Sequence, residues 1–561
     1  MLIFYMNICD SISKFLRKVY LIFHTVRYLK FIQIANRITR KFRVIRTQGE
    51  MIYTIKDRKE EYIVHQYDRT PYVDDFVFVF LNEVGILTDW NCKEKSKLWL
   101  YNLHYFDVLN SPGSNNRKKY NQELIENWID KNSPCIGNGW EPYTLSLRIV
   151  NWIKYFLSAD FCFEKAEKSL FVQARVLYQS IEYHLLGNHL FANAKALIFA
   201  GVYFEGEESK RWLYRGISIL DKEISVQVLN DGGHFELSPM YHNIILSDML
   251  DLYNLSCAYH IEELEKYKER LKEKIEKMLL FSISLTHPDG EVSFFNDSSI
   301  GIAPKTSSLF EYAHKLSLLK KKLNSTQFVK ESNCSALSFS DSGYVVIDSP
   351  ECKLIVDCAK VGPDFIPGHA HADSLSFELS LFGFRVFVNS GTSEYGLTSE
   401  RLRQRRTSSH NTVVINQVDS SEVWGGFRVA KRAYPIDRSV EQEADKVVVQ
   451  CSHDGYKRLK HKVIHRRKWQ CFRNQVIICD NLEGKLETAE AHYHLHPDIN
   501  AELVGGQVKL VLPNGHVVLV RSSDSVRIID STWHPEFGKC LPNKKLLVSF
   551  EGNDSSIIIE Y

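Results

Sequence analysis

The sequence lacks the features that mark several common classes of protein. Its twelve cysteines form no CxxC pair and no regular framework, which argues against zinc fingers and a disulfide scaffold and predicts reduced, mostly buried thiols. The chain contains 70 Lys and Arg and 68 Asp and Glu, and this near-neutral balance argues against a protein whose overall surface binds nucleic acid. No stretch reaches the roughly 18 to 20 uncharged apolar residues of a membrane span. Any anionic ligand must therefore meet local clusters of basic side chains.

The N-terminal stretch is short of acidic residues and of signal-peptide features. Residues 1–46 carry ten Lys and Arg against the single acid Asp10. Charged residues interrupt the apolar runs and no cleavage site of small residues follows them, so the stretch does not fit a secretory signal peptide. Two interpretations stay open: a basic amphipathic helix that lies on a membrane surface, and a helix that packs on the rest of the protein.

Length and hydrophobic patterning indicate domains of two kinds. At about 100 to 200 residues per domain, 561 residues allow two to four. From Glu141 to Leu285 apolar residues recur at helical spacing with short breaks, which predicts antiparallel helical hairpins. From Ala336 onward short β-branched and aromatic runs are separated by Gly, Asn, Asp and Pro, which predicts an antiparallel sandwich. The predicted parts are a basic amphipathic helical segment, a helical domain and a β-sandwich domain, at residues 1–50, 51–325 and 326–561.

Between Leu98 and Ile415 a series of motifs resembles the heparinase II/III family of polysaccharide lyases, which is also similar to some alginate lyases. In chain order they are "LWLYNLHYFDVL", "WEPYTLSLRIVNWIKYF", "GNHLFANAKALIFAG", "DGGHFELSPMYH", "GHAHADSLSFELSLFGFRVFVNSGT" and "RRTSSHNTVVIN". The resemblance implies an incomplete (α/α) toroid of helical hairpins followed by an antiparallel β-sandwich, with the active site in the cleft between them.

The implied reaction is β-elimination from a uronic acid residue of a polysaccharide. The enzyme must neutralise the carboxylate, remove the proton on C5 and protonate the departing O4 oxygen. By resemblance, Asn188 and His189 of "GNHL" stabilise the carboxylate. Asn is also a good N-cap when it precedes a segment whose apolar residues recur at helical spacing. The alternative role of Asn188 is therefore to cap a helix that begins at His189. Some relatives carry a glutamate where this chain has Ala192, so any role of that acid is absent.

Two further motifs resemble the acid and base of the family. Tyr241 of "SPMYH" corresponds to the residue that passes a proton to or from the sugar, and His369 of "GHAH" to a base across the sugar from it. Tyrosine, with a pKa near ~10, is a useful acid and a poor base until positive charge lowers that pKa. The alternative for Tyr241 is an ordinary aromatic at a helix start. His234, Glu236 and His242 are expected to support this pair or to line the cleft.

The second histidine of the same motif, His371, resembles a metal ligand. The resemblance completes that site with Asn389 and His410, although relatives carry an acid at the position of Asn389. A neutral amide gives up charge that helps to hold zinc or calcium. One structural divalent metal and a set of hydrogen-bonded histidines therefore both stay open. If the following strand already includes His369 and His371, both side chains lie on its apolar face, because that face is formed by odd-numbered positions.

Substrate contacts are expected from arginines and aromatic residues. "RLRQRRTSSH" suits a carboxylated or sulfated glycan through bidentate contacts, and Arg406 is the predicted contact, with a solvated loop as the alternative. Tyr395 is a further candidate. Trp140 and Trp152 could stack on sugar rings or pack in the core.

Two classes of function follow. The first is a lyase that cleaves a uronic-acid-containing glycan, such as a glycosaminoglycan. The second is a glycan-binding protein of surface-polysaccharide assembly that has lost the chemistry, which the substitutions Ala192 and Asn389 favour. The expected partner is an acidic polysaccharide and not nucleic acid, with peripheral membrane contact through the basic N-terminus. The resemblance implies the periplasm or cell envelope, while the unrecognised signal peptide keeps a cytoplasmic location open.

Overall fold

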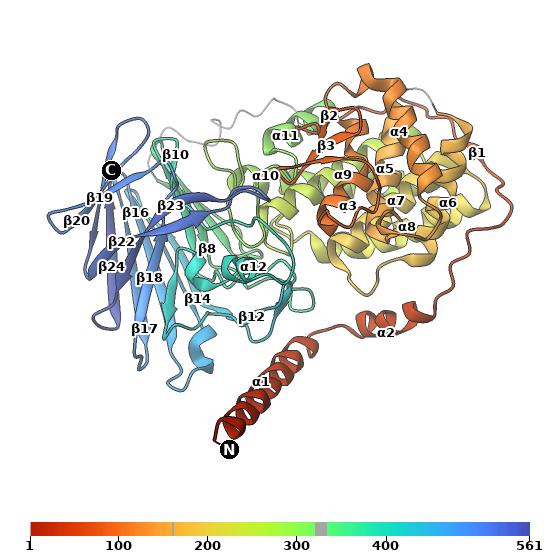
Figure 1. Ribbon diagram of the computed structural model, residues 1–561. Coiled ribbons are helices and arrows are strands. Elements are labelled where there is room, and N and C mark those ends of the chain that lie inside the picture. Colours follow the sequence, from red (N-terminus) through yellow and green to blue (C-terminus); the bar gives the residue numbers. More distant parts are fainter. Residues whose placement is uncertain (1, 160–161, 320–333) are drawn as a thin grey trace.

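The computed structural model of the chain describes residues 2–159, 162–319 and 334–561. A helical body and a β-rich body lie side by side in chain order, which confirms the predicted fold class (Figure 1). The last helix of the first body ends at Lys315 and the first strand of the second begins at Ser335. The predicted boundary between residues 325 and 326 lies outside the described residues.

Helical hairpins build the first body. The helical pattern predicted from Glu141 to Leu285 forms helices α5 to α10, and α3, α4 and α11 join them. The bounds are α3 (Lys97–Tyr105), α4 (Lys118–Lys131), α5 (Pro142–Ala159), α6 (Glu164–Ser180), α7 (Gly187–Tyr203), α8 (Glu207–Gln227), α9 (Pro239–Tyr259), α10 (Glu262–Ser284) and α11 (Thr306–Lys315). Helix α7 is buried on almost every side, as expected of a helix that is apolar all round. A Cβ on Gly201 would lie 2.6 Å from the backbone N of Leu213, so this glycine lets α8 approach α7 closely.

The helical body also contains short strands that the hydrophobic pattern did not predict. Strands β2 (Tyr72–Asp74), β3 (Val77–Phe80) and β4 (Glu83–Ile86) form an antiparallel sheet, and β1 (Thr54–Ile55) pairs with β5 (Phe204–Glu205). The indole of Trp99 donates a hydrogen bond to the carbonyl of Glu83 at 3.0 Å. This contact fixes the three-stranded sheet to α3.

The second body consists of antiparallel sheets around one core. The first sheet has the spatial order β10 (Phe384–Phe387), β9 (Phe377–Leu381), β8 (Cys352–Asp357), β7 (Tyr344–Asp348) and β6 (Ser335–Ser338). The second has the order β14 (Pro435–Gln442), β15 (Lys446–His453), β16 (Ile464–Phe472), β17 (Gln475–Glu483), β24 (Asp554–Glu560), β21 (Val517–Ser522), β20 (Gln507–Val511) and β19 (Asn500–Val504). The third has the order β11 (Val413–Ile415), β18 (Ala489–His494), β23 (Leu541–Ser549) and β22 (Ser525–Trp533). Val356, Trp469 and Tyr493, one from each sheet, share this core. Burial alternates residue by residue along β16, as a strand with one buried face requires.

The two histidines of "GHAH" do not belong to a strand. Strand β9 begins only at Phe377, so His369 and His371 lie in the loop that follows β8, and the expected shared parity with the strand face is wrong. Tertiary contacts, and not the backbone hydrogen bonds of a β-sheet, hold this loop in place. The guanidinium of Arg405 donates to the carbonyl of Ala370 at 2.9 and 3.0 Å. The two imidazoles are therefore free to face different partners.

The N-terminal segment runs along the outside of both bodies as α1 (Leu2–Val26) and α2 (Phe31–Thr39) (Figure 1). Helix α1 packs on a small hairpin of β12 (Val423–Trp424) and β13 (Arg428–Val429). The indole of Trp424 donates to the hydroxyl of Thr25 at 3.0 Å, and Arg17 forms an ion pair with Glu422 at 2.9 Å. Apolar side chains such as Phe15 nevertheless stay exposed, and membrane contact remains a prediction.

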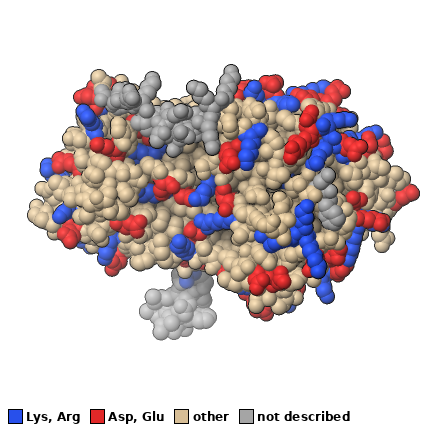
Figure 2. Space-filling model, turned by 90° about the horizontal axis from the view of Figure 1, so that it is seen from above, with Lys and Arg blue, Asp and Glu red and all other residues tan. Residues whose placement is uncertain are grey.

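Charge is mixed over the surface. Figure 2 shows basic and acidic side chains interspersed on the face seen from above, without a broad region of one sign. Within the described ranges, no helix combines the length and apolar character needed to cross a bilayer.

Candidate active site

Tyr241 stands at the start of α9, where the helix faces the β-rich body. The hydroxyl of Ser238 accepts a hydrogen bond from the backbone N–H of Tyr241 at 3.2 Å, and Pro239 occupies the first turn, so cap and proline fix the helix start. The Tyr241 ring stacks on the imidazole of His369, with centroids 3.9 Å apart and planes 15° apart. Its hydroxyl lies 3.0 Å from that of Tyr395.

This stacking corrects the predicted placement of His369 across the sugar from Tyr241. Rings in contact leave no space for a sugar between them, so both side chains belong to one wall of the site. The sequence motifs carry no information on this distance, because the two residues come from different bodies.

His369 is held by a buried carboxylate. Its Nδ1 is hydrogen-bonded to Glu236, which is 2% exposed, and Nε2 has no hydrogen-bond partner among the described residues. Burial by itself would raise the pKa of Glu236, but the charge and hydrogen bond of His369, with smaller contributions from His234 and His189, keep that pKa below its usual value. In the neutral imidazole the same carboxylate favours the proton on Nδ1, and the lone pair of Nε2 is then available as a base.

Tyr241 has the opposite character. Burial, and then the neighbouring Tyr395 and Asp297, raise the pKa of the Tyr241 phenol well above its usual value. The charge of Arg401 acts on Tyr241 in the opposite direction but does not reverse this shift, so the hydroxyl keeps its proton at neutral pH. The pair therefore combines a base with a proton donor.

Asn188 lies in the first turn of α7 and does not cap it. The helix begins at Gly187, and the N-cap position is Leu186, whose side chain makes no capping hydrogen bond. The predicted cap is therefore wrong. The chain turns into the helix at Leu186 and Gly187, with φ of 66° and 57°, and so the helix begins before the apolar pattern does. The side chain of Asn188 is instead near the phenol of Tyr143, and it lowers the Tyr143 pKa that burial raises.

His189 follows in the same turn and carries the electrostatics of a carboxylate receptor. Its Nδ1 lies 3.2 Å from Oε2 of the buried Glu182, and its ring packs on Tyr143 with centroids 4.4 Å apart. Burial would lower the pKa of His189, but the charge and hydrogen bond of Glu182 raise it above the usual value. The protonated imidazole is thus favoured, and a cation beside an amide suits an incoming carboxylate.

Glu236 connects these two groups of residues. A Cβ on Gly187 would lie 3.0 Å from Oε1 of Glu236, so the start of α7 touches the carboxylate that holds His369. The helical body supplies Asn188, His189 and Tyr241, and the β-rich body supplies His369 across the junction.

The predicted metal ligands come together only in part. Nδ1 of His371 lies 3.3 Å from Nε2 of His410, and Nε2 of His371 lies 2.8 Å from Asp297. The side-chain oxygen of Asn389 accepts the backbone N–H of Asn411 at 3.1 Å. Burial lowers the pKa of His371 to about 4, and burial and His371 lower that of His410, so both imidazoles are neutral.

The fit of this set to a metal is incomplete. Two nitrogen ligands of one tetrahedral zinc ion stand about 3.3 Å apart, as His371 and His410 do, but Asn389 adds no charge. Over the described ranges, no group of three or more His, Cys, Asp or Glu side chains is placed to hold a metal ion. Metal binding stays a prediction, with a hydrogen bond between the two imidazoles as its alternative.

The arginine near the site is not the predicted one. Arg401 is fully buried, forms a two-point ion pair with Asp297 and lies 5.0 Å from the centroid of the Tyr395 ring. The side chain of Arg406 is 53% exposed and lies 3.8 Å from Asp419, which fits the solvated-loop alternative. Sequence reasoning missed Asp297 and Arg401, because Arg401 lies in the short helix α12 (Ser399–Gln404) and meets Asp297 across 104 positions of sequence.

Four other predicted candidates lie in the interior. Trp140 is 7% exposed, its indole N–H donates to the carbonyl of Asn132 at 3.2 Å, and Trp152 is fully buried, so both are core residues and not sugar platforms. His234 and His242 are buried as well, and burial lowers their pKa values to about 4 and about 3. They lie behind the site and do not line it.

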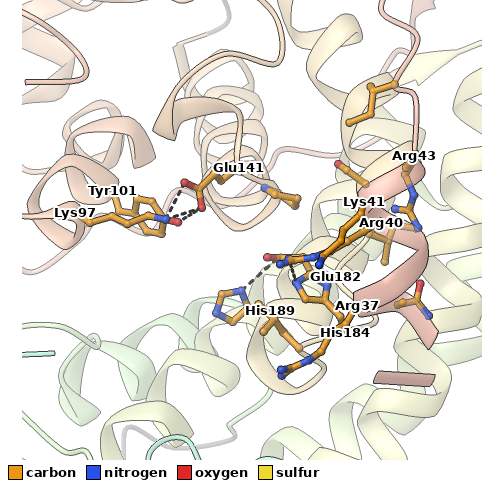
Figure 3. A pocket seen from close by; sticks show the side chains of 16 residues that line it. Arg37, Arg40, Lys41, Arg43, Lys97, Tyr101, Glu141, Glu182, His184 and His189 are labelled. Atoms are coloured by element: carbon orange, nitrogen blue, oxygen red, sulfur yellow. Dashed lines mark hydrogen bonds and ion pairs between the residues drawn. The ribbon is translucent and has the colours of Figure 1, made fainter. Parts of the chain in front are cut away.

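A cavity of about 650 Å³ opens beside His189 (Figure 3). Its lining includes Glu182 but neither Tyr241 nor His369. The site therefore extends from His189 into this cavity, on the side away from Tyr241 and His369.

Comparisons with known proteins cover nearly the whole chain. Residues 44–319 match the family model "Heparinase II/III N-terminus", and residues 333–560 match "Heparinase II/III-like, C-terminal". A heparin-sulfate lyase of Bacteroides stercoris is 28% identical over 335 residues, which are 56% of this chain and 46% of that protein. A heparin-sulfate lyase of Pedobacter heparinus is 30% identical over 255 residues, 43% of this chain and 37% of that protein. The chain thus matches about half the length of these relatives or less.

Solved structures share the fold. A crystal structure of heparinase III has a TM-score of 0.67 at 21% identity and covers 85% of this chain and 79% of its own. A chondroitin AC lyase of Streptomyces coelicolor has a TM-score of 0.50 at 10% identity, covering 82% and 74%. These similarities establish a toroid of helices followed by β-sheets.

Proposed function

Because the chain belongs to the heparinase II/III family, we propose that it is a polysaccharide lyase that cleaves a uronate-containing glycan by β-elimination. The observation that carries this proposal is the contact between Tyr241, whose phenol keeps its proton, and His369, whose Nδ1 is held by Glu236. A base and an acid in contact are what removal of a C5 proton and protonation of O4 require.

Each proposed step uses one side chain. Protonated His189 and the amide of Asn188 face the uronate carboxylate and stabilise the negative charge that develops as the C5 proton leaves. Nε2 of His369 takes that proton, and Glu236 stabilises the resulting imidazolium. The electron pair of the C5–H bond forms the C4–C5 double bond, the C4–O4 bond breaks, and Tyr241 gives its proton to O4. Proton transfer from the imidazolium to the phenolate restores both groups.

The second candidate is a glycan-binding protein without the chemistry. Ala192 and Asn389 support it, because both depart from the family pattern. The acid, the base and the base's carboxylate partner are all present and in contact, which supports the enzyme more strongly.

Incubation of the purified protein with a panel of glycans separates the two. Because the relatives are heparin-sulfate lyases, heparin and heparan sulfate are the first glycans to test, followed by hyaluronan, alginate and bacterial capsular polysaccharides. A lyase produces a 4,5-unsaturated uronate, which absorbs in the ultraviolet. No absorbance with any glycan, together with retained binding of one of them, would establish the second candidate.

A further inference from the structure

The N-terminal segment bridges the two bodies beside the site. The side-chain amide of Gln33 in α2 donates to the carbonyl of Phe365 in the β-rich body at 3.2 Å. Arg40, which follows α2, lies 2.6 Å from Nε2 of His184 in the helical body, and Arg43 donates to the carbonyl of Gln179 at 2.8 Å. Most of this segment precedes residue 44, where the family match begins.

The same segment forms one wall of the cavity beside His189. Figure 3 shows the basic side chains from Arg37 in α2 to Arg43 on one side and the group of Lys97, Tyr101 and Glu141 on the other, with His189 between them. A volume of about 650 Å³ lies within the range of about 300 to 1,000 Å³ that is usual for small-molecule sites. One end of the cavity is thus the proposed receptor of the uronate carboxylate.

The cavity carries an excess of positive charge. Its two acids already have partners: Glu141 pairs with Lys97 at 2.9 Å, and Glu182 with His189 at 3.2 Å. Five Lys and Arg line the cavity, namely Arg37, Arg40, Lys41, Arg43 and Lys97. Within the described part of the chain, Arg37 and Lys41 form no ion pair, and their side chains are exposed. Clustered cations without counter-charges attract an anionic ligand.

Two neighbouring groups respond to this charge. Burial, followed by the charge of Arg40, lowers the pKa of His184 to about 4. Burial and the charges of Arg40 and Arg428 lower the pKa of Arg37. An anion in the cavity would offset the part of each shift that comes from the neighbouring positive charges.

We propose that this cavity is an anion subsite that binds a sulfate or second carboxylate on a sugar next to the uronate that is cleaved. The inference rests on the proposed function for the position of the uronate at His189. A glycan is favoured over a lipid surface because the cations surround a concave space that continues to His189, whereas a bilayer would meet an open, outward-facing patch. The basic wall of the subsite, from Arg37 to Arg43, precedes residue 44, where the family match begins.

A charge-removal variant tests the subsite. Arg37→Gln combined with Lys41→Gln removes two cations that hold no ion pair among the described residues, so the fold should persist. The matched control is Lys18→Gln with Arg211→Gln, which removes the same charge from exposed side chains that do not line the cavity. Titration calorimetry at several salt concentrations gives the affinity for a heparan sulfate fragment and for an unsulfated glucuronate polymer.

We expect the double variant to bind the sulfated fragment on the order of tenfold more weakly, with a shallower salt dependence, and the control to match the wild type. For turnover of the fragment, KM should rise while kcat stays within about twofold, since no reacting group is changed. Unchanged affinity for both glycans would overturn the subsite. So would a loss of binding to phosphatidylserine-containing vesicles with glycan binding intact, which would assign the cluster to a membrane.

The subsite and the proposed reaction fail separately. If the wild type produces no unsaturated uronate but the double variant still loses affinity for the sulfated fragment, the subsite stands and the elimination does not. If elimination proceeds and the double variant keeps its affinity and KM, the reaction stands and the subsite does not.

Discussion

The imidazole of His369 stacks face to face on the phenol ring of Tyr241, with ring centroids 3.9 Å apart. One residue comes from a loop of the β-rich body and the other from the first turn of a helix in the helical body. The contact places a proposed base and a proposed acid on the same wall of the site, and three of the predictions below depend on it.

Replacing Tyr241 with Phe removes one hydroxyl and keeps the stacked ring. We expect kcat to fall on the order of 10²-fold or more, because a positioned proton donor is lost, while glycan affinity and melting temperature stay nearly unchanged. Initial rates of ultraviolet absorbance measure the loss. Tyr395→Phe is the matched control, since it breaks the same hydrogen bond of 3.0 Å but removes no proposed acid. Activity within a few-fold of wild type would remove Tyr241 from the mechanism.

His369→Ala should be nearly inactive, whereas His234→Ala should be milder. Both imidazoles are near Glu236, but the side chain of His369 is 15% exposed and its Nε2 has no hydrogen-bond partner among the described residues. His234 is fully buried, and its Nε2 lies 3.2 Å from Gln227, so no ligand reaches it. Single-turnover rates on a defined oligosaccharide measure the difference. The reverse order of activities would mean that the base has been misassigned.

An acid and a base on one wall reach the same face of a sugar. In D-glucuronate the C5 proton and O4 lie on one face, whereas inversion at C5 in L-iduronate puts the proton on the other. We therefore expect a glucuronate polymer to be cleaved at least about tenfold faster than the same polymer after C5 epimerisation. Equal initial rates would show that the two rings separate when substrate binds.

His189 should make stability depend on pH. Its folded pKa is raised by Glu182 despite burial, so its stabilising contribution is complete below the unfolded pKa of about 6.5 and is lost as pH rises through the folded value. The free energy of unfolding of the wild type should fall over that window more than that of His189→Gln. Denaturant titrations between about pH 6 and pH 9 measure this. Glu182→Gln should flatten the curve in the same way, and parallel curves for all three proteins would contradict the pairing.

Asn389→Asp tests the metal site. If Asn389 converges with His371 and His410, the added carboxylate should raise zinc affinity, and the melting temperature should rise with the logarithm of zinc concentration. With a chelator the same variant should be less stable, because a buried carboxylate then lacks a cation. Adding His371→Ala should abolish the zinc response. A melting temperature that ignores zinc in both wild type and Asn389→Asp would leave His371 held by hydrogen bonds alone.

Local patterns determined the order of the elements. Helices α6, α8 and α10 and the strand of "NQVIICD" show the repeat of 3.6 or 2 that burial of one face leaves. Helices α5, α7 and α9 and the strand of "GYVVID" are buried on most sides, and their apolar runs indicated them instead. The motifs also brought Tyr241, His369 and His189 forward as candidates. The apolar pattern can be found from this chain alone, whereas the three candidates came from the resemblance of their short motifs to the family.

The partners of those candidates were decided by the tertiary structure. Glu236 meets His369 across 133 positions of sequence, and Arg401, not Arg406, turns toward Asp297. The apolar pattern could not predict the conformation of the loop that carries His369. It also could not predict that the segment around Arg37 forms a wall of the cavity. Contacts between side chains on separate bodies depend on how those bodies dock, and docking is set by the summed packing of both surfaces, which no local repeat encodes.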